Sequence, residues 1–319
     1  MNQKIYAYIA IFFSMLFWGM SFIWTKDLLI AGFTPIIIIT LRVFISATLL
    51  FTVFKLAGKL DKIDKKDYKL FLMLGFFEPF LYFFGENWGL QYLDASLGSI
   101  IISTIPVFVP FLMYFFHKEA LRWQIILGVF LTIIGLGIMT ISPNLTFDVS
   151  GKGVALMFLA VFSACGYSVV LFKVIQKYEA ITITTTQNII GAIYYIPLFF
   201  IFEFKTFKTL TFSFETIYPI FALAILCSSI AFICYSYSAK RLSISKTTVF
   251  TNAVPIVTII FVVLLGKESL TTSKVLGMLI VIVGVFLSQI DFKKRIIKRR
   301  YYASKSRVSA KVLPGIQGK

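Results

Sequence analysis

Charged side chains are scarce in this sequence. Asp, Glu, Lys and Arg together make up 14% of the 319 residues, against about a quarter in an average globular domain. Hydrophobic residues make up 59%, including 36 phenylalanines, and the mean hydropathy is +0.90. A chain with so little polar surface cannot cover a water-soluble globule. The composition therefore excludes a soluble enzyme and a disordered protein, and it predicts a protein whose solvent is the bilayer.

Cysteine and histidine are also sparse, and neither occurs in a pattern typical of a chemical site. Three cysteines, Cys165, Cys227 and Cys234, lie inside apolar runs without ligand spacing, and the chain has one histidine. This pattern excludes a disulfide framework and predicts no metal site. The sequence has no Gly-x-x-x-x-Gly-Lys-Ser/Thr motif that would bind a nucleotide. We therefore expect no cofactor, and a gradient must supply any driving energy.

Positive charge is in excess, with 31 Lys and Arg against 14 Asp and Glu. Nucleic-acid binding needs a basic face on a folded domain, whereas these positive charges lie between apolar runs. We interpret them as topology signals and expect no nucleic-acid partner.

Ten apolar runs dominate the chain. A hydrocarbon core of about 30 Å needs about 20 helical residues, and helices satisfy their own backbone hydrogen bonds in lipid. The runs lie near residues 5–26, 34–56, 68–90, 95–116, 123–142, 152–175, 182–203, 215–238, 245–266 and 273–291. The predicted fold class is an all-α integral membrane protein with ten transmembrane helices.

The distribution of lysine and arginine predicts the orientation, because positive loops stay in the cytoplasm. If the N-terminus is inside, the inner segment 55–69 alone carries six lysines, as many basic residues as all the outer loops together. We therefore expect a multi-pass protein of the cell membrane with both termini cytoplasmic. The basic tail, residues 292–319, is either a solvated topology anchor or a site for anionic lipid headgroups.

The chain contains an internal repeat. At a constant offset of 149 residues the two halves share two prolines, two glutamates and four glycines, which are Pro106 and Pro255, Glu119 and Glu268, Gly128 and Gly277, and Gly135 and Gly284. The first run matches the sixth at an offset of 147. The copies cover 1–145 and 150–291. A unit with five spans must begin its second copy on the opposite side, which predicts two inverted five-helix repeats, an arrangement typical of secondary transporters.

Several motifs carry a family resemblance. They are Trp18-Gly19-x-Ser21, Arg42, Leu90-Gln91-Tyr92-x-x-Ala95-Ser96 leading to Pro106, Glu119-x-Leu121, and Gly266-Lys267-Glu268-x-Leu270. In this order, over nearly the whole chain, they resemble the EamA-type family of the drug/metabolite transporter superfamily. The resemblance implies a carrier of small metabolites with a central cavity lined mainly by helices 1, 3, 4, 6, 8 and 9, and alternating access. The second copy departs from the first: it has Cys165 where the first has Trp18, and its seventh helix lacks an equivalent of Arg42.

Two charged residues near the outer side of the membrane lie within reach of each other. Arg42 follows the start of the second helix by seven residues, about 10 Å, and Glu86 precedes the outer end of the third by four, about 6 Å. One interpretation is a structural ion pair between them. The other places Arg42 on a substrate carboxylate or phosphate, which its planar guanidinium suits.

Glu78 is expected near the midplane, ten residues into the third helix and next to Pro79. No lysine or arginine lies at that depth, so Glu78 should be protonated or face a wet cavity. It is either a neutral acid hydrogen-bonded to a neighbouring helix or a group for proton coupling or for binding a substrate amine. Tyr82 and Glu86 share its helix face.

The remaining candidates are weaker. Ser103 in the fourth helix and Asn252 in the ninth precede Pro106 and Pro255, and such prolines either kink the helix for packing or present free carbonyls to a ligand. Trp18 and Tyr235 are candidates for substrate contact, although core packing or interhelical hydrogen bonding explains them equally well. The four repeated glycines predict close contact between helices 5 and 10.

The predicted function is secondary transport of a small metabolite, such as an amino acid or related amphipathic solute, by alternating access, in the export direction. Proton coupling and a homodimer are left open. The alternatives are an intramembrane enzyme, which would need a clustered acid/base or metal set, and a membrane scaffold or regulator without solute flux. The sequence favours a protein that is not an enzyme.

Overall fold

The computed structural model describes residues 2–117, 123–140, 149–242, 244–269 and 271–289. Every element in these ranges is helical. The α-helices are α1 (Asn2–Ile30), α2 (Pro35–Leu56), α3 (Tyr68–Gly75), α4 (Tyr82–Tyr92), α5 (Ala95–Ile102), α6 (Ile105–His117), α7 (Trp123–Thr140), α8 (Gly151–Val174), α9 (Ala180–Leu198), α10 (Phe204–Thr209), α11 (Phe214–Ala222), α12 (Ala231–Leu242), α13 (Ile244–Val249), α14 (Ala253–Leu264) and α15 (Thr272–Gln289). The π-helical segments are η2 (Phe76–Leu81), η3 (Phe199–Glu203) and η4 (Leu223–Ile230), and the 3₁₀ turns are η1 (Lys65–Asp67) and η5 (Phe250–Asn252). The basic tail 292–319, with its predicted lipid binding, and Glu119, Leu121 and Leu270 lie outside the described residues.

The predicted all-α membrane architecture is confirmed in its coarse form. Seven helices in the described ranges are long and apolar enough to cross a bilayer, and two shorter apolar helices, Ile126–Met139 and Thr272–Leu287, accompany them. The third predicted run is not one continuous helix, because α3, η2 and α4 share it. The number of ten crossings stays a prediction.

Local sequence explains where the helices begin and turn. Thr34 caps α2 by accepting a hydrogen bond from the Ile37 amide at 3.4 Å, and Pro35 occupies the first helical position, where no amide donor is needed. The preceding turn places Gly32 at φ = 89°, a conformation that glycine adopts without steric cost. These residues fix the tight reversal between α1 and α2.

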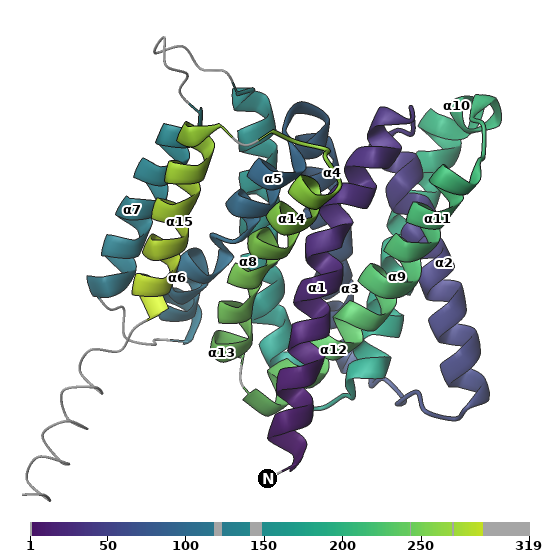
Figure 1. Cartoon of the computed structure of the whole chain (residues 1–319). Coiled ribbons are helices and arrows are strands. Elements are labelled where there is room, and N and C mark those ends of the chain that lie inside the picture. Colours follow the sequence, from purple (N-terminus) through teal and green to yellow (C-terminus); the bar gives the residue numbers. More distant parts are fainter. Residues whose placement is uncertain (1, 118–122, 141–148, 243, 270, 290–319) are drawn as a thin grey trace, which may run out of the picture.

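Helices from the two halves of the sequence pack against each other pairwise. The main pairs are α7 with α15, α4 with α8, α1 with α12, and α2 with α9. In Figure 1, α7 and α15 stand side by side at one edge, while α1 runs through the middle of the bundle. The two halves of the chain are therefore interleaved and do not form separate bodies.

The predicted glycine contact between the fifth and tenth runs is confirmed. A Cβ on Gly277 of α15 would lie 2.5 Å from the carbonyl oxygen of Gly135 on α7, and a Cβ on Gly284 would lie 3.0 Å from the carbonyl oxygen of Gly128. Real Cβ atoms essentially never approach within 3.0 Å, so glycine is what lets these two helices approach so closely.

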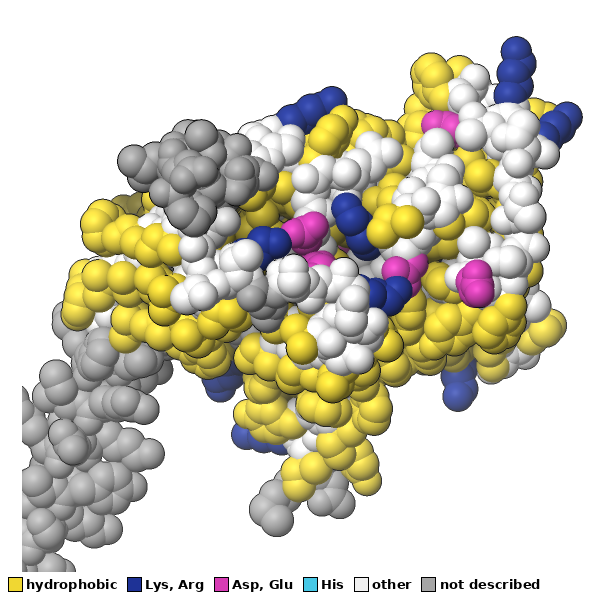
Figure 2. All heavy atoms as spheres, turned by 45° about the horizontal axis from the view of Figure 1, so that its top comes forward, with side chains coloured by type: hydrophobic (Ala, Val, Ile, Leu, Met, Phe, Trp, Pro, Cys, Tyr) yellow, Lys and Arg dark blue, Asp and Glu magenta, His cyan; other side chains and the backbone are white. Residues whose placement is uncertain are grey.

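The distribution of side chains fits a protein that is surrounded by lipid. Large hydrophobic residues are exposed on the outside, for example Phe12 at 62% and Phe202 at 65%, whereas Arg42, Glu78 and Glu86 are buried. We call the face where α1 ends the Lys26 face and the face where α1 begins the N-terminal face. Figure 2 shows the Lys26 face, with charged side chains of both signs in its middle and hydrophobic side chains around it.

An ionic cluster joins the two halves at the N-terminal face. The ammonium of Lys177, just after α8, lies 2.9 Å from a carboxylate oxygen of Asp67, just before α3, and the Tyr178 hydroxyl donates to the same carboxylate at 2.8 Å. These hydrogen bonds, that from Lys177 first, hold the pKa of the Asp67 carboxyl below its usual range. The cluster therefore favours ionised Asp67 in the folded chain.

Candidate functional site

A cavity of about 50 Å³ lies in the centre of the bundle. Its walls come from both halves of the chain. The lining residues are Trp18, Ser21, Phe22, Arg42, Glu78, Tyr82, Phe83, Glu86, Ile102, Ile105, Ala164, Tyr167, Ser168, Phe232, Tyr235, Thr248, Thr251 and Val254. Six of the eight residues proposed from the sequence are among them, namely Trp18, Arg42, Glu78, Tyr82, Glu86 and Tyr235.

Arg42 of α2 and Glu86 of α4 form the ion pair that one reading of the sequence expected. Nη1 of Arg42 lies 3.9 Å from Oε2 of Glu86, and both side chains are almost fully buried. The guanidinium also donates through Nε to the Ser228 hydroxyl at 2.9 Å and lies over the Phe83 ring, 3.9 Å from its centroid. Nη1 makes no hydrogen bond with the described residues. The pair is loose enough to leave donor capacity facing the cavity.

The helix that carries Glu78 is interrupted at that residue. Glu78 has φ = −146° and ψ = 117°, an extended conformation inside η2. The continuous helix expected from the sequence is therefore wrong at this point. The physical reason is Pro79, which has no amide donor and disfavours the helical conformation of the residue before it.

Side chains of the second half satisfy backbone carbonyls that the interruption exposes. The Ser163 hydroxyl of α8 donates to the carbonyl oxygen of Phe77 at 2.6 Å, and the Tyr195 hydroxyl of α9 donates to that of Phe80 at 2.6 Å. Buried carbonyls without partners are costly. These two hydrogen bonds therefore stabilise the extended segment around Glu78.

The two buried carboxylates of the cavity have different surroundings. Glu86 accepts hydrogen bonds from the Tyr82 hydroxyl and the Asn87 amide, each at 3.4 Å, besides its ion pair. Glu78 is 6% exposed and is influenced by the charges of Glu86 and Arg42, but it makes no hydrogen bond or ion pair with the residues that the structure describes. A buried polar group normally has a partner, so Glu78 is the cavity group most available to a ligand or a proton.

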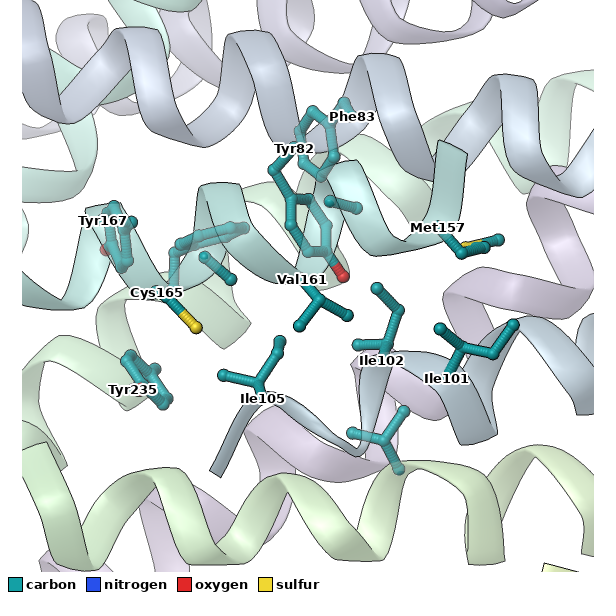
Figure 3. Close-up of a cluster of buried hydrophobic side chains, with 14 of the residues drawn as sticks. Tyr82, Phe83, Ile101, Ile102, Ile105, Met157, Val161, Cys165, Tyr167 and Tyr235 are labelled. Carbon is teal, nitrogen blue, oxygen red and sulfur yellow. The ribbon is translucent and has the colours of Figure 1, made fainter. Parts of the chain in front are cut away.

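Aromatic rings form a large part of the cavity wall. The Trp18 indole donates to the carbonyl oxygen of Cys227 at 3.3 Å, and its ring lies 5.1 Å from those of Phe232 and Tyr235. Figure 3 shows Tyr82, Val161, Ile102 and Ile105 pointing toward one another from different helices. The wall is thus largely apolar, with a few hydroxyl groups and the three ionisable groups.

Ser103 and Asn252 do not line the cavity. Ser103 donates to the carbonyl oxygen of Ile100 at 2.7 Å within its own helical turn. Asn252, at 3% exposure, has an amide without a hydrogen-bond partner among the described residues. The structure therefore places both near the breaks of their helices and outside the lining of the cavity.

Several lining residues escaped the sequence reasoning, although the repeat offset marks them. Five pairs of lining residues are separated by one of the repeat offsets. The offset is 147 for Ser21 and Ser168, and it is 149 for Phe83 and Phe232, Glu86 and Tyr235, Ile102 and Thr251, and Ile105 and Val254. Among the ionisable candidates, the offset leads from Glu86 to a lining residue, Tyr235, whereas the counterpart of Glu78 is Cys227, which is not part of the lining. The cavity is built largely from corresponding positions of the two copies.

Metal chemistry finds no support in the described ranges. They contain no group of three or more His, Cys, Asp or Glu residues that could hold a metal ion.

Comparisons with known proteins agree with the fold and identify the family. The EamA-like transporter family matches the chain twice, at residues 5–141 and 151–289. An uncharacterized transporter of Archaeoglobus fulgidus is 27% identical over 280 residues, covering 88% of this chain and 97% of the relative. The uncharacterized transporter YoaV of Bacillus subtilis is 23% identical over 281 residues, covering 88% and 95%.

A solved crystal structure of a protein with 14% sequence identity has the same fold, with a TM-score of 0.62 over 87% of this chain and 98% of that chain. The family resemblance predicted from the motifs is confirmed. The chain belongs to the EamA-like transporter family and is a multi-pass membrane transporter, not an enzyme.

Proposed function

We propose that the protein is a secondary transporter that exports a small amphipathic solute, such as an amino acid, across the cell membrane by alternating access. The single observation that carries the proposal is the buried central cavity, whose walls combine aromatic rings with Arg42, Glu78 and Glu86. A site of this kind at the interface of two repeats is typical of secondary transporters.

The proposed architecture is ten transmembrane helices in two inverted repeats, 1–145 and 150–291. The packing supports it. The pairs α1 with α12 and α8 with α4 correspond to each other under exchange of the two halves, while α2 with α9 and α7 with α15 each pair an element with its own counterpart. This is the pattern that a two-fold axis relating the copies produces.

The chemistry of the cavity favours a solute with separated charges. Nη1 of Arg42 has hydrogen-bonding capacity for a carboxylate, and the carboxyl of Glu78, which lines the same cavity, suits an ammonium group. The aromatic wall suits an apolar portion. At about 50 Å³ the space is small beside drug-binding pockets of about 300–1,000 Å³, which favours a small metabolite.

Glu78 is proposed as the coupling group. A buried carboxyl that binds either a proton or a substrate amine links the two fluxes, because one excludes the other. Both termini are proposed to be cytoplasmic, and a homodimer is not required, since the cavity is complete within one chain.

The test is transport by purified protein in proteoliposomes with an imposed pH gradient. A thermal-shift screen of small metabolites first finds a ligand, because binding to the folded state raises apparent stability. Glu78→Gln is expected to abolish the pH dependence of flux. Glu215→Gln, an exposed carboxylate in the first turn of α11, is the control and should behave as wild type. Unchanged flux and pH dependence in Glu78→Gln would remove this residue from the mechanism, and absence of flux for every ligand found would favour the scaffold alternative.

A further inference from the structure

Lys26 caps the end of a helix of the first half. Its ammonium donates to the carbonyl oxygens of Leu90 at 2.8 Å and Leu93 at 2.9 Å, where α4 ends. The last carbonyls of a helix have no intrahelical partner and carry the negative end of the helix dipole. Lys26 therefore ties the end of α1 to the end of α4 with two charge-assisted hydrogen bonds.

The corresponding lysine of the second half makes no such contact. Lys173 occupies the equivalent place in α8, at an offset of 147 residues. It is exposed, and it forms no hydrogen bond or ion pair with the described residues. At the repeat offset of 149, the counterparts of Leu90 and Leu93 are Ala239 and Leu242, at the end of α12. No described side chain donates to these two carbonyls.

Helix packing shows the same asymmetry between the Lys26 face and the N-terminal face. All eight residues of α5 are buried, and α5 packs against α1. Its counterpart α13 exposes Lys246 and makes no comparable contact with α8. The half-helix next to Lys26 is thus buried along its whole length, whereas the half-helix next to Lys173 exposes one lysine, Lys246.

Further polar contacts connect helix ends at the Lys26 face. Lys267 pairs with Asp27, Lys274 lies 2.6 Å from Asp94, and the Glu268 carboxylate accepts from the Ser96 amide at 3.2 Å. Figure 2 shows basic and acidic side chains next to one another in the middle of this face. Each of these contacts joins the first half either to the segment between α14 and α15 or, through Lys274, to the first turn of α15.

We propose that Lys26 and Lys173 are alternate latches, each of which caps the third helix of its own half when its face of the transporter is closed. The structure represents the state in which the Lys26 face is closed and the Lys173 latch is released. When the Lys26 face opens, Lys26 leaves the end of α4 and Lys173 binds the carbonyls at the end of α12. This inference rests on the proposed alternating access and adds the residues that hold each state.

The two states can be distinguished by the reactivity of a single cysteine. In a background with Cys165, Cys227 and Cys234 replaced by alanine, Ser99→Cys reports opening of the Lys26 face, since Ser99 is fully buried in α5. Thr248→Cys reports opening of the N-terminal face, since Thr248 is the counterpart of Ser99 at an offset of 149 and lines the cavity. The probe is a membrane-impermeant maleimide applied to either side of oriented vesicles.

Lys26→Gln is expected to raise the labelling rate at Ser99→Cys and to lower it at Thr248→Cys, by about tenfold in their ratio, which corresponds to about 1.4 kcal/mol. Lys173→Gln is expected to shift the ratio in the opposite direction. Because the Lys173 side chain is exposed and makes no contact, this variant should fold normally even if Lys26→Gln does not.

Two control variants remove a positive charge without removing a cap. They are Lys152→Gln, whose ammonium contacts the Tyr92 hydroxyl on the Lys26 face, and Lys69→Gln, an exposed lysine at the start of α3. Neither should change the labelling ratio.

An unchanged ratio in Lys173→Gln, or a shift in the same direction as Lys26→Gln, overturns the latch proposal. Flux of wild-type protein in proteoliposomes tests the proposed function separately: flux without a lysine effect refutes the latches alone, and absence of flux refutes both.

Discussion

Replacing Gly191 by alanine should displace the interrupted helix that carries Glu78. Gly191 lies on α9 against Pro79, and a Cβ built on it would overlap Cγ of the proline ring and lie 3.1 Å from Cδ. The ring is rigid and has no alternative rotamer, so the backbone of α9 or of η2 must move to relieve the overlap.

The expected cost follows from two terms. Overpacking of a well-packed core costs about 1–3 kcal/mol. Tyr195 lies four residues further along the same face of α9, so the movement also stretches its hydrogen bond to the Phe80 carbonyl oxygen, now 2.6 Å. A hydrogen bond of this kind contributes about 0.5–1.5 kcal/mol. The helix preference of alanine over glycine returns about 0.5–1 kcal/mol. Gly191→Ala should therefore destabilise the protein by about 0.5–4 kcal/mol and reduce the maximal transport rate.

The assay is thermal unfolding in detergent micelles together with flux in proteoliposomes. Gly137→Ala in α7 is the matched control, since a Cβ there meets nothing within 4 Å. Alanine is better than glycine inside a helix by about 0.5–1 kcal/mol, so this variant should be as stable as wild type or slightly more. Wild-type stability and flux in Gly191→Ala would refute the view that α9 holds the segment around Glu78.

Two other perturbations test the ionic cluster and the glycine contact. Because the folded pKa of Asp67 lies below its unfolded value of about 3.9, its stabilisation is complete above that value and is lost as pH falls through the folded pKa. Asp67→Asn should lower the unfolding temperature at pH 7 by an amount that shrinks below about pH 4, whereas the exposed Asp64→Asn should have little effect at either pH; an Asp67 difference that persists in acid would contradict this. Gly277→Ala should destabilise the α7–α15 pair by about 1–3 kcal/mol in the same unfolding assay, and a result equal to that of Gly137→Ala would show that the two helices separate without cost.

Much of the fold is predictable because the bilayer leaves few choices. Long apolar runs must become helices in lipid. The repeated glycines predicted the contact between α7 and α15 from the sequence alone. The interruption at Glu78 was missed, although Pro79 gave the local signal. A proline inside a helical run either kinks it or breaks it. The outcome here depends on Ser163 and Tyr195, which lie far away in the sequence and donate hydrogen bonds to the exposed carbonyl oxygens.

The candidate site was predictable in its ionisable members and less so in its neutral ones. A buried charge in an apolar run is conspicuous, so Arg42, Glu78 and Glu86 could be named from sequence. Tyr167 and Thr248 could not, because hydroxyl groups satisfy themselves within helices as often as they face a cavity. Ser103 and Asn252 are a different case: their position before a proline suggested exposure to ligand, but they are not among the residues that line the cavity, although their neighbours Ile102 and Thr251 are.

All three ionisable groups of the cavity belong to one half of the chain. The counterparts of Glu78 and Glu86 at an offset of 149 are Cys227 and Tyr235, so exchanging the halves does not exchange like for like. Under the proposed alternating access, the two end states are consequently not isoenergetic, even with identical solutions on both sides. A carrier without net driving force cannot create a gradient, so a lower half-saturation concentration at one face must be matched by slower turnover from that face. The sequence difference between the two copies thus predicts different half-saturation concentrations and turnover rates at the two faces.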